Sequence, residues 1–300
     1  MSDRKFVIIV DSIAALGKAE REAYGVDDIC PMTVSIDDKD VIASPDYDQG
    51  YSCHDYFEIM RQGKRIFTSQ VPVPTFEDRF NYYVEKGCDI LYIGCSLRLS
   101  KSVEAGQKVA ENILKKHPEA KIICFDARNS NKAVGDMART AARLRGEGKS
   151  LEEVHEYLLA NRNRWNQFGA VETLTYLRQA GRVKASKAFF GNLFSIKPIL
   201  ISDTEGNNYA IKNCKGRKNS LLEIARMGVE AAEDPANAIF YISHADDEAA
   251  AELVKAEILR LCKPKEINVG PFDPIVGAST GPGTVAVYVF GKEVTFTSPE

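Results

Sequence analysis

A glycine followed directly by an arginine marks one place in the chain where an anion could bind. Gly181 fits the left-handed residue that closes a helix, because it has no Cβ to oppose a positive φ. Arg182 then leaves a fixed backbone, and the largely apolar stretch from Ala185 to Phe194 that follows predicts a second helix. A guanidinium beside so apolar a helix needs an anionic partner, either a carboxylate of the protein or a ligand.

Hydroxyl side chains form the second set of candidate binding groups. Thr68 and Ser69 stand before two prolines that hold the backbone extended, and Ser96 follows a strand predicted at 89–94. In open α/β sheets the ligand groups lie at the carboxyl ends of the strands, and helix N-terminal amides attract anions. Hydroxyls before a proline-stiffened turn are also common in plain loops, so both interpretations stay open at this point.

An aspartate and a serine follow the apolar run Phe6–Val10, which is typical of a parallel strand buried on both faces. Asp11 and Ser12 would then lie at the ligand-binding edge of the sheet. The alternative is that one of these side chains only caps the helix predicted from Leu16 to Tyr24.

Strands that alternate with helices predict an α/β fold whose N-terminal domain is a βαβ array with a largely parallel sheet. The other strands expected in this half are 29–36, 89–94 and 122–125, with helices at 52–62, 76–86 (capped by Thr75), 103–116, 133–145 and 151–164. The second half predicts a mixed α/β domain with antiparallel edges. Its expected strands are 196–201, 208–212, 238–242 and a hairpin of 285–290 with 293–296, and its further helices are 220–232 and 248–262. The expected domains are 1–164 and 165–300.

Composition excludes several classes of partner. Of 300 residues, 44% are hydrophobic and 27% charged, and the formal net charge of −3 gives no reason to expect nucleic acid or an anionic membrane. The N-terminal apolar run is too short for a signal peptide or a membrane span, so we expect a cytoplasmic protein. Seven scattered cysteines and four histidines without metal-binding spacing predict reduced thiols and no metal site.

Seven short motifs, taken in order, resemble those of the DegV family of bacterial lipid-binding proteins along nearly the whole chain. They are Val10-Asp11-Ser12, Thr68-Ser69-Gln70, Cys95-Ser96-Leu97-Arg98-Leu99-Ser100, Phe125-Asp126, Gly181-Arg182-Val183, the stretch from Gly191 to Leu200, and Gly277-Ala278-Ser279-Thr280-Gly281-Pro282-Gly283. The resemblance implies two domains with a ligand tunnel between them that holds one long-chain fatty acid. Members of the family are similar to the acyl-binding subunit of bacterial fatty acid kinase, which presents the carboxylate to a separate ATP-binding subunit.

The resemblance also implies the residues and partners of the site. The predicted ligand-binding residues are Thr68, Ser69, Ser96, Arg182, Ser279 and Thr280. The implied partners are a long-chain fatty acid and an ATP-binding fatty acid kinase subunit, with only transient membrane contact. We expect a lipid-binding protein without cofactor, metal or catalytic residues of its own.

Three positions depart from the family's pattern. The residues 95–100 keep two serines but lack both glycines of the family's Ser-Ser-Gly-x-Ser-Gly, Ala127 stands where serine is frequent, and Ser279 replaces the histidine that commonly precedes Thr-Gly-Pro-Gly. Arg98 adds a cation to the first of these motifs. It could point inward as a second cation for the head group, or outward to the tunnel mouth where a kinase subunit would dock.

An enzyme and a ligand-free interaction module are the alternative functions. A stand-alone serine hydrolase would use Ser96 as nucleophile with His244 as the base, but Ser96 does not lie in a Gly-x-Ser-x-Gly elbow. A phosphotransferase acting alone would need the phosphate-binding pattern Gly-x-x-x-x-Gly-Lys-Ser/Thr, and the sequence has none. An interaction module would have a filled seam in place of the tunnel.

Overall fold

The computed structural model describes residues 5–185 and 196–299, and the chain groups into two units. The first unit comprises Met1–Gln49, Thr68–Arg162 and Asp273–Ile275. The second unit comprises Gly50–Phe67, Asn163–Phe272 and Val276–Glu300. This division departs from the expected contiguous domains 1–164 and 165–300, because one segment from each half belongs to the other half's unit.

Four parallel strands form the main sheet of the first unit. They are β1 (Phe6–Asp11), β2 (Asp28–Cys30), β6 (Asp89–Gly94) and β7 (Ile122–Asp126), in the order β2-β1-β6-β7. Every residue of β1 and β6 is buried, which explains why both are nearly continuous apolar runs rather than alternating ones. The prediction of a largely parallel sheet in this half is confirmed.

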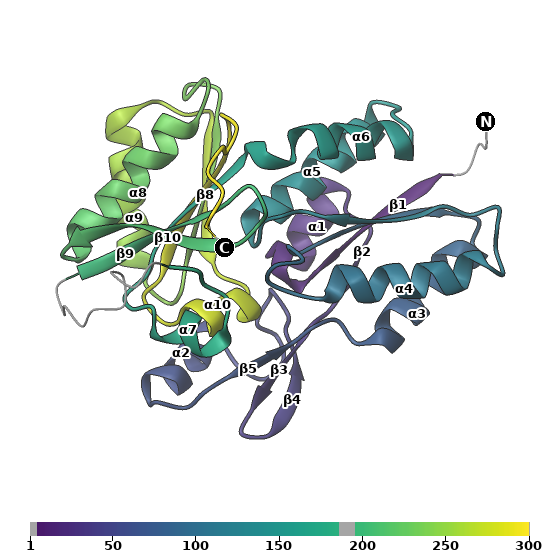
Figure 1. Cartoon of the computed structure of the whole chain (residues 1–300), viewed down its shortest axis with the longest axis horizontal. Helices are drawn as coiled ribbons and strands as arrows, with labels where there is room; N and C mark the ends of the chain where they lie inside the picture. Colours follow the sequence, from purple (N-terminus) through teal and green to yellow (C-terminus); the bar gives the residue numbers. More distant parts are fainter. Residues whose placement is uncertain (1–4, 186–195, 300) are drawn as a thin grey trace. The chain divides into compact units, whose positions relative to one another are not determined.

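Helices cover both faces of this sheet. They are α1 (Lys18–Tyr24), α3 (Val73–Glu85), α4 (Ser102–Leu114), α5 (Lys132–Gly146) and α6 (Leu151–Asn161). Figure 1 shows α5 and α6 on one face and α3 and α4 on the other. The rings of Phe76 and Phe80 on α3 lie 5.1 and 6.2 Å from that of Tyr92 on β6. Aromatic packing therefore fixes α3 against the centre of the sheet.

The start of α3 differs from the prediction. The helix begins at Val73 instead of Phe76, so Thr75 lies in its first turn and does not cap it. Pro74 is the second helical residue, where the missing N–H would have no partner within the helix in any case.

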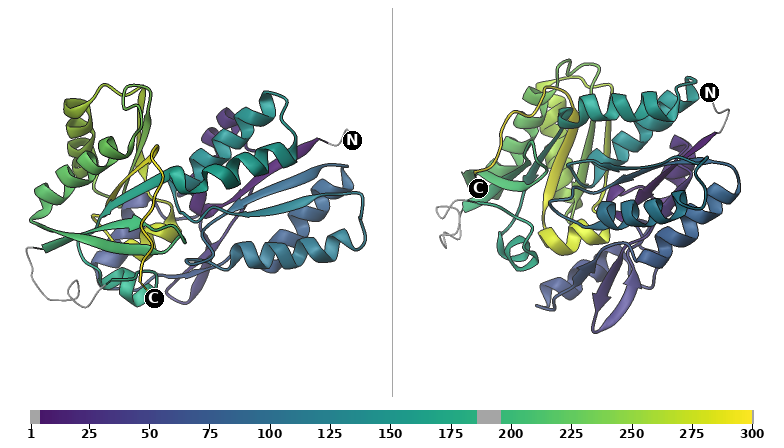
Figure 2. Two further views of the ribbon diagram at one scale, coloured as in Figure 1. Left: turned by 45° about the horizontal axis from the view of Figure 1, so that its top comes forward. Right: turned by 45° about the vertical axis from the view of Figure 1, so that its right-hand side comes forward.

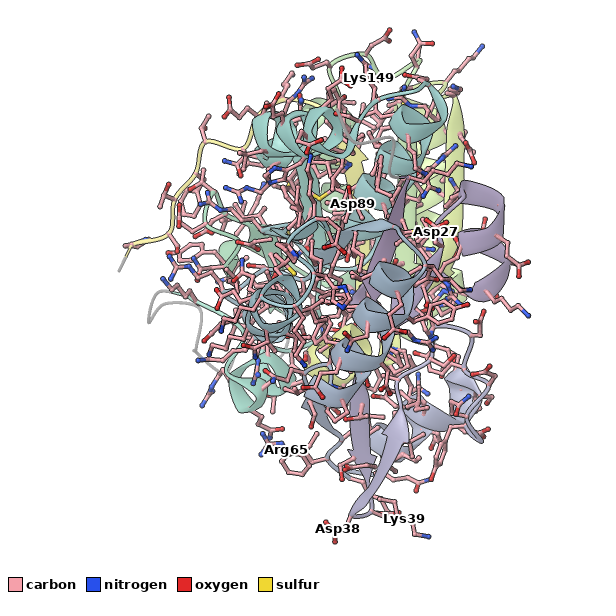
Figure 3. All side chains as sticks on the ribbon, turned by 90° about the vertical axis from the view of Figure 1, so that its right-hand side faces the viewer. Asp27, Asp38, Lys39, Arg65, Asp89 and Lys149 are labelled. Atoms are coloured by element: carbon pink, nitrogen blue, oxygen red, sulfur yellow. The ribbon has the colours of Figure 1, made fainter. Side chains whose placement is uncertain are left out.

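A small sheet of order β4-β3-β5 was not predicted. The strands β3 (Thr33–Ile36) and β4 (Lys39–Ile42) form an antiparallel hairpin, and β5 (Phe67–Ser69) lies beside β3. Asp37 and Asp38 have φ angles of 49° and 59°, as the central residues of a type I′ turn do. Figure 3 shows Asp38 at the tip of this hairpin.

The strand expected at 29–36 is wrong as a single element. It is two strands in two sheets, β2 and β3, separated by Pro31 and Met32. Pro31 has no backbone N–H to donate, so a strand that contains it cannot be hydrogen-bonded without a break to neighbouring strands on both of its edges.

Six strands form the sheet of the second unit. They are β8 (Trp165–Ala170), β9 (Ile196–Ser202), β10 (Asn208–Lys215), β11 (Ile239–His244), β12 (Glu266–Pro271) and β13 (Val285–Phe290), in the order β10-β9-β8-β13-β11-β12. β11 and β12 run parallel, and the other neighbours are antiparallel. The prediction of a mixed sheet is confirmed.

β13 lies in the middle of that sheet, between β8 and β11. The predicted hairpin of 285–290 with 293–296 is therefore wrong, because both edges of β13 are already paired. The chain beyond it bonds elsewhere: the Val294 N–H donates to the Asn163 carbonyl (2.8 Å), and the Phe296 carbonyl accepts from the Thr204 N–H (2.9 Å).

Two groups of helices belong to the second unit. Figures 1 and 2 show α8 (Arg217–Ala231) and α9 (Glu248–Leu261) side by side on one face of the sheet, where their apolar side chains pack on strand residues such as Phe240. The others are α2 (Cys53–Arg61), α7 (Thr175–Ala180) and, from Val276 onward, α10 (Pro274–Thr280), whose first two residues belong to the first unit. None of the helices in the described residues is both long and apolar enough to span a membrane. The helix expected at 185–194 lies, apart from Ala185, outside the described residues.

Candidate ligand-binding site

The strand order of the first unit creates a topological switch point between β1 and β6. The chain passes from β1 to β2 on one side, whereas β6 lies on the other side of β1. In open α/β sheets the crevice at such a point, outside the carboxyl ends of the strands, is where ligands bind. Asp11 ends β1, and Cys95 and Ser96 directly follow β6, so all three lie at this edge.

Asp11 has a structural role at this edge. Its carboxylate is fully buried and accepts hydrogen bonds from the Ile13 N–H (3.1 Å), the Tyr92 hydroxyl (3.0 Å) and the Cys95 N–H (3.2 Å). Burial raises the pKa of the Asp11 carboxyl to about 6, and the hydrogen bonds oppose that rise. Asp11 caps the short 3₁₀ turn Ser12–Ala14 and not a helix beginning at Leu16, since α1 starts only at Lys18.

Ser96 is buried at the start of a tight turn. Its N–H donates to the Asn129 carbonyl (3.0 Å), and its own carbonyl accepts from the N–H groups of Leu99 and Ser100 (both 2.9 Å). The Ser96 hydroxyl accepts from the Arg98 N–H at 3.2 Å. This hydroxyl is therefore held in one place by the turn that it closes, as a preorganised ligand donor must be.

The loop after β7 supports the same turn from the other side. Asp126 Oδ1 accepts from the N–H groups of Leu97 (3.2 Å) and Arg128 (3.0 Å). Arg128 and Asn131 have positive φ angles of 47° and 53°, which are uncommon for residues other than glycine. Asp126, singled out in the sequence, therefore positions the Ser96 turn through the Leu97 backbone.

Thr68 and Ser69 lie on β5, where Thr68 is half-buried and Ser69 is exposed. Their segment is connected to the loop that follows Ser96. The Val71 N–H donates to Ser102 Oγ (3.1 Å), which lies 3.0 Å from Ser100 Oγ. Two of the predicted hydroxyl motifs are thus joined within the first unit.

Arg98 is exposed in the described structure. Exposure agrees with the interpretation in which its guanidinium points outward from the Ser96 turn.

Arg182 lies in the second unit, at the end of α7. Gly181 has φ 69° and closes this helix in the left-handed conformation, as predicted. The Arg182 N–H donates to the Leu177 carbonyl (3.0 Å), and the exposed guanidinium contacts the Ala180 carbonyl. The fixed backbone that the sequence predicts for Arg182 is present.

Ser279 and Thr280 are the last residues of α10. Thr280 is buried and its hydroxyl donates to the Val276 carbonyl at 2.9 Å, whereas Ser279 is half-buried. The Gly281 that follows has φ 84°, and a Cβ there would lie 2.1 Å from the ring of Tyr176. Only glycine fits this close approach between the loop and α7.

The six predicted residues divide between the units: Thr68, Ser69 and Ser96 in the first, and Arg182, Ser279 and Thr280 in the second. Arg217 was not singled out from the sequence, although its half-buried side chain contacts the Gly283 carbonyl and the carboxylate of Glu172. The Gly216-Arg217 pair, which repeats the Gly181-Arg182 pattern, was the signal available.

The described residues contain no group of three or more His, Cys, Asp and Glu side chains that could hold a metal. All seven cysteines lie in the described ranges, and none of them forms a disulfide. His244, the candidate base of a hydrolase, has its Nδ1 3.3 Å from the Asp247 N–H, from which it accepts. Burial lowers the pKa of His244, so its ring orders a loop as a neutral acceptor.

Comparisons with known proteins agree with this architecture. The sequence model described as "Uncharacterised protein, DegV family" matches residues 5–292. A DegV domain-containing protein of Clostridium perfringens is 30% identical over 289 residues, or 96% of this chain and 98% of that protein.

Solved structures give the same family. A DegV family protein from Thermus thermophilus, whose structure is described as showing fatty acid binding, has a TM-score of 0.85 at 26% identity. The match covers 96% of this chain and 99% of that protein. A fatty-acid-binding DegV family protein from Streptococcus agalactiae has a TM-score of 0.83 at 21% identity, with 97% of this chain and 100% of that one covered. The chain therefore belongs to the DegV family.

Proposed function

We propose that the chain binds a long-chain fatty acid and that Ser96 donates its hydroxyl to the carboxylate. The observation that carries this proposal is the position of Ser96, which is buried beside the switch point in a turn supported by Asp11 and Asp126. The fatty acid binding described for the Thermus thermophilus relative, at 26% identity, supports the choice of ligand.

The two ends of a fatty acid make different demands on a protein. Each buried methylene contributes about 0.8 kcal/mol, so a chain of about sixteen carbons gains on the order of 12 kcal/mol before the cost of immobilisation. The carboxylate cannot be buried without hydrogen-bond donors or a cation. We assign that role to Ser96 with Thr68, Ser69, Arg182, Ser279 and Thr280, and the ligand tunnel that the resemblance implies stays a prediction.

Native mass spectrometry of gently purified protein, followed by lipid extraction, tests the binding. The expected result is a mass increment that matches a long-chain fatty acid, or one that appears after loading with a panel of chain lengths. Absence of any bound lipid at micromolar concentrations after loading would exclude the proposal and leave an interaction module.

We further propose that the bound carboxylate is presented to an ATP-binding kinase subunit. The kinase would transfer the γ-phosphoryl group of ATP to a carboxylate oxygen, giving an acyl phosphate and ADP. Its acyl group can be trapped with hydroxylamine as a hydroxamate, which releases phosphate. Hydroxamate that forms only when this chain, the ATP-binding subunit of a bacterial fatty acid kinase, ATP and oleate are all present supports this role. Oleate binding without hydroxamate would contradict the kinase role alone.

A further inference from the structure

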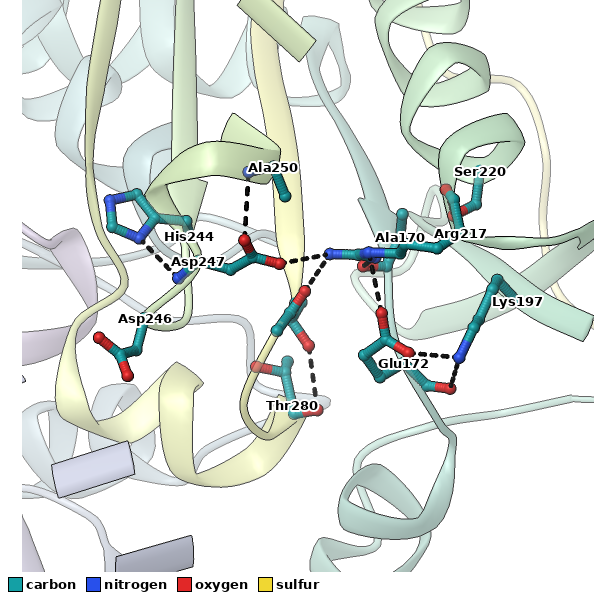
Figure 4. A network of polar contacts seen from close by, with 12 residues as sticks. Ala170, Glu172, Lys197, Arg217, Ser220, His244, Asp246, Asp247, Ala250 and Thr280 are labelled. Atoms are coloured by element: carbon teal, nitrogen blue, oxygen red, sulfur yellow. Dashed lines mark hydrogen bonds and ion pairs between the residues drawn. The ribbon is translucent and has the colours of Figure 1, made fainter. Parts of the chain in front are cut away.

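A half-buried arginine contacts the loop that follows α10. Arg217 is the first residue of α8, and its side chain is only 21% exposed. Its guanidinium donates to the carbonyls of Ala170 (3.1 Å) and Gly283. Figure 4 shows Arg217 between the carboxylates of Glu172 and Asp247, whose oxygens lie 2.9 and 3.6 Å from its nitrogens. One side chain thus joins β8, the start of α9 and this loop.

The loop at 280–284 depends on contacts from outside itself. Gly281 and Gly283 have φ angles of 84° and 77°, and glycine loses more conformational freedom on folding than other residues. The Gly283 N–H donates to the Ala245 carbonyl at 2.8 Å, while the Gly283 carbonyl accepts from Arg217. Both backbone polar groups of Gly283 are therefore bonded to other parts of the second unit.

These contacts reach the predicted head-group residues through two threonines. Thr284 Oγ1 donates to the Thr280 carbonyl at 3.1 Å, and Thr280 Oγ1 donates to the Val276 carbonyl at 2.9 Å. A displacement of Gly283 would therefore move Thr280, and with it Ser279.

Glu172 connects the guanidinium to a second cation. Its carboxylate pairs with Lys197 of β9, whose Nζ also donates to the Glu172 carbonyl at 3.2 Å (Figure 4). A Cβ at Gly283 would lie 2.9 Å from Glu172 Cγ, so this side chain packs directly on the loop. Lysine at position 217 could not replace the network, because a single ammonium nitrogen cannot reach two carbonyls and two carboxylates in the arginine geometry.

We propose that Arg217 is a positioning residue for the ligand head group: it clamps Gly283 and so keeps Ser279 and Thr280 in the geometry that binds a carboxylate. The inference rests on the proposed fatty acid binding and adds to it a residue that acts through the loop. Its two parts, the clamp and the effect on the ligand, are measured separately.

Hydrogen exchange of the full chain without ligand measures the clamp. In Arg217→Lys, amides in a peptide covering 279–285 are expected to exchange at least tenfold faster, with no change in a peptide from 255–261 at the end of α9, away from the Asp247 contact. Arg226→Lys is the matched control, because Arg226 is on the same helix but pairs with Glu223 and Glu230 at the surface. Unchanged exchange at 279–285 in folded Arg217→Lys overturns the proposal, whatever the protein binds.

Comparison of oleate with oleyl alcohol measures the effect on the head group. Arg217→Lys is expected to weaken oleate binding at least tenfold more than binding of the neutral alcohol, a difference that general loss of packing would not produce. Equal losses for both ligands overturn the head-group role. If the wild-type chain binds neither ligand, the proposed function fails and the head-group role fails with it, while hydrogen exchange still reports the clamp.

A second variant covers the case in which Arg217→Lys does not fold. Glu172→Gln keeps Arg217 and its two carbonyl contacts but removes one carboxylate. Faster hydrogen exchange at 279–285 and a selective loss of oleate binding are both expected, each smaller than in Arg217→Lys. If a folded Glu172→Gln protein shows neither change, the proposal is overturned.

Discussion

The carboxylate of Asp11 and the backbone nitrogen of Cys95 lie 3.2 Å apart, and this hydrogen bond ties the end of β1 to the loop that carries Ser96. The two residues are 84 positions apart in the chain. The geometry of the candidate site therefore depends on a buried carboxyl group whose pKa is raised to about 6.

The raised pKa makes the contribution of Asp11 to stability depend on pH. Between pH 3.8 and about 6 the folded protein keeps a proton on Asp11 that the unfolded chain has released. Asp11 therefore favours folding at low pH. As the pH rises through that range, the free energy of unfolding falls by about 3 kcal/mol, which corresponds to a shift of about two pKa units. Urea unfolding measures the free energy of unfolding of wild type and of Asp11→Asn. Between pH 4 and pH 7, the stability of the wild type relative to Asp11→Asn should fall by up to that amount.

Tyr92→Phe is the companion to this experiment. It keeps the carboxyl group but removes a hydrogen bond that lowers the pKa of Asp11 in the folded protein, so the upper end of the pH-dependent range should move to higher pH while the lower end stays in place. A free-energy difference between wild type and Asp11→Asn that is constant over the whole pH range would contradict the assignment.

Arg182→Ala is expected to weaken oleate binding more than Arg178→Ala does. Both side chains are at the end of α7, but only Arg182 follows the left-handed Gly181. Loss of a charge-assisted contact should cost roughly 1.5–3 kcal/mol, or about 10- to 150-fold in Kd by calorimetry. Equal affinities of the two folded variants would remove Arg182 from the site.

Ser96→Ala is expected to affect both stability and ligand binding, whereas Ser69→Ala should affect stability little. The buried Ser96 hydroxyl accepts from the Arg98 N–H, so its removal should cost about 1 kcal/mol in the free energy of unfolding. Ser69 is exposed. Oleate affinity measured at matched folded fractions separates the two effects, and an unchanged Kd for Ser96→Ala would show that its hydroxyl is not a ligand donor.

Gly281→Ala is expected to destabilise the protein by at least about 2 kcal/mol. The left-handed conformation alone costs a residue with a Cβ about 1–2 kcal/mol, and the new atom would lie 2.1 Å from the ring of Tyr176. Gly270→Ala is the control, because a Cβ at Gly270 meets nothing within 4 Å. Thermal unfolding compares the two variants, and similar melting temperatures would mean that the loop at Gly281 can adapt.

Purified protein is expected to hydrolyse neither ATP nor nitrophenyl esters. The turn that contains Ser96 is held by backbone groups, and His244 accepts a hydrogen bond from the Asp247 N–H. Turnover of either substrate above that of a Ser96→Ala control would revive the hydrolase alternative.

Strands that bury continuous apolar runs could be predicted from the sequence, and β1 and β6 are examples. β8 was missed because its polar residues are paired with distant partners. Asn166 donates to the Lys292 carbonyl at 2.9 Å, and Gln167 donates to Asn208 at 3.1 Å. No local pattern in the sequence reveals such pairing.

The candidate site shows the same limit. Gly181 could be predicted because a helix end is a local feature. Arg217 was missed despite the Gly216 before it, because the predicted helix began at Ser220 and the partners of the guanidinium are distant in the sequence. Lys197, in the strand predicted at 196–201, is a similar case, because its Nζ pairs with Glu172, 25 residues earlier in the chain.

The central place of β13 also bears on how the protein is made. A ribosome delivers β8 to β12 before β13, yet β13 is the strand that joins β8 to β11. Until residue 290 has emerged, β8 and β11 each present an unpaired edge, which is a template for association with other chains. The second unit therefore completes its sheet late in translation, and ribosome stalling within its last helices would leave a nascent chain prone to aggregation.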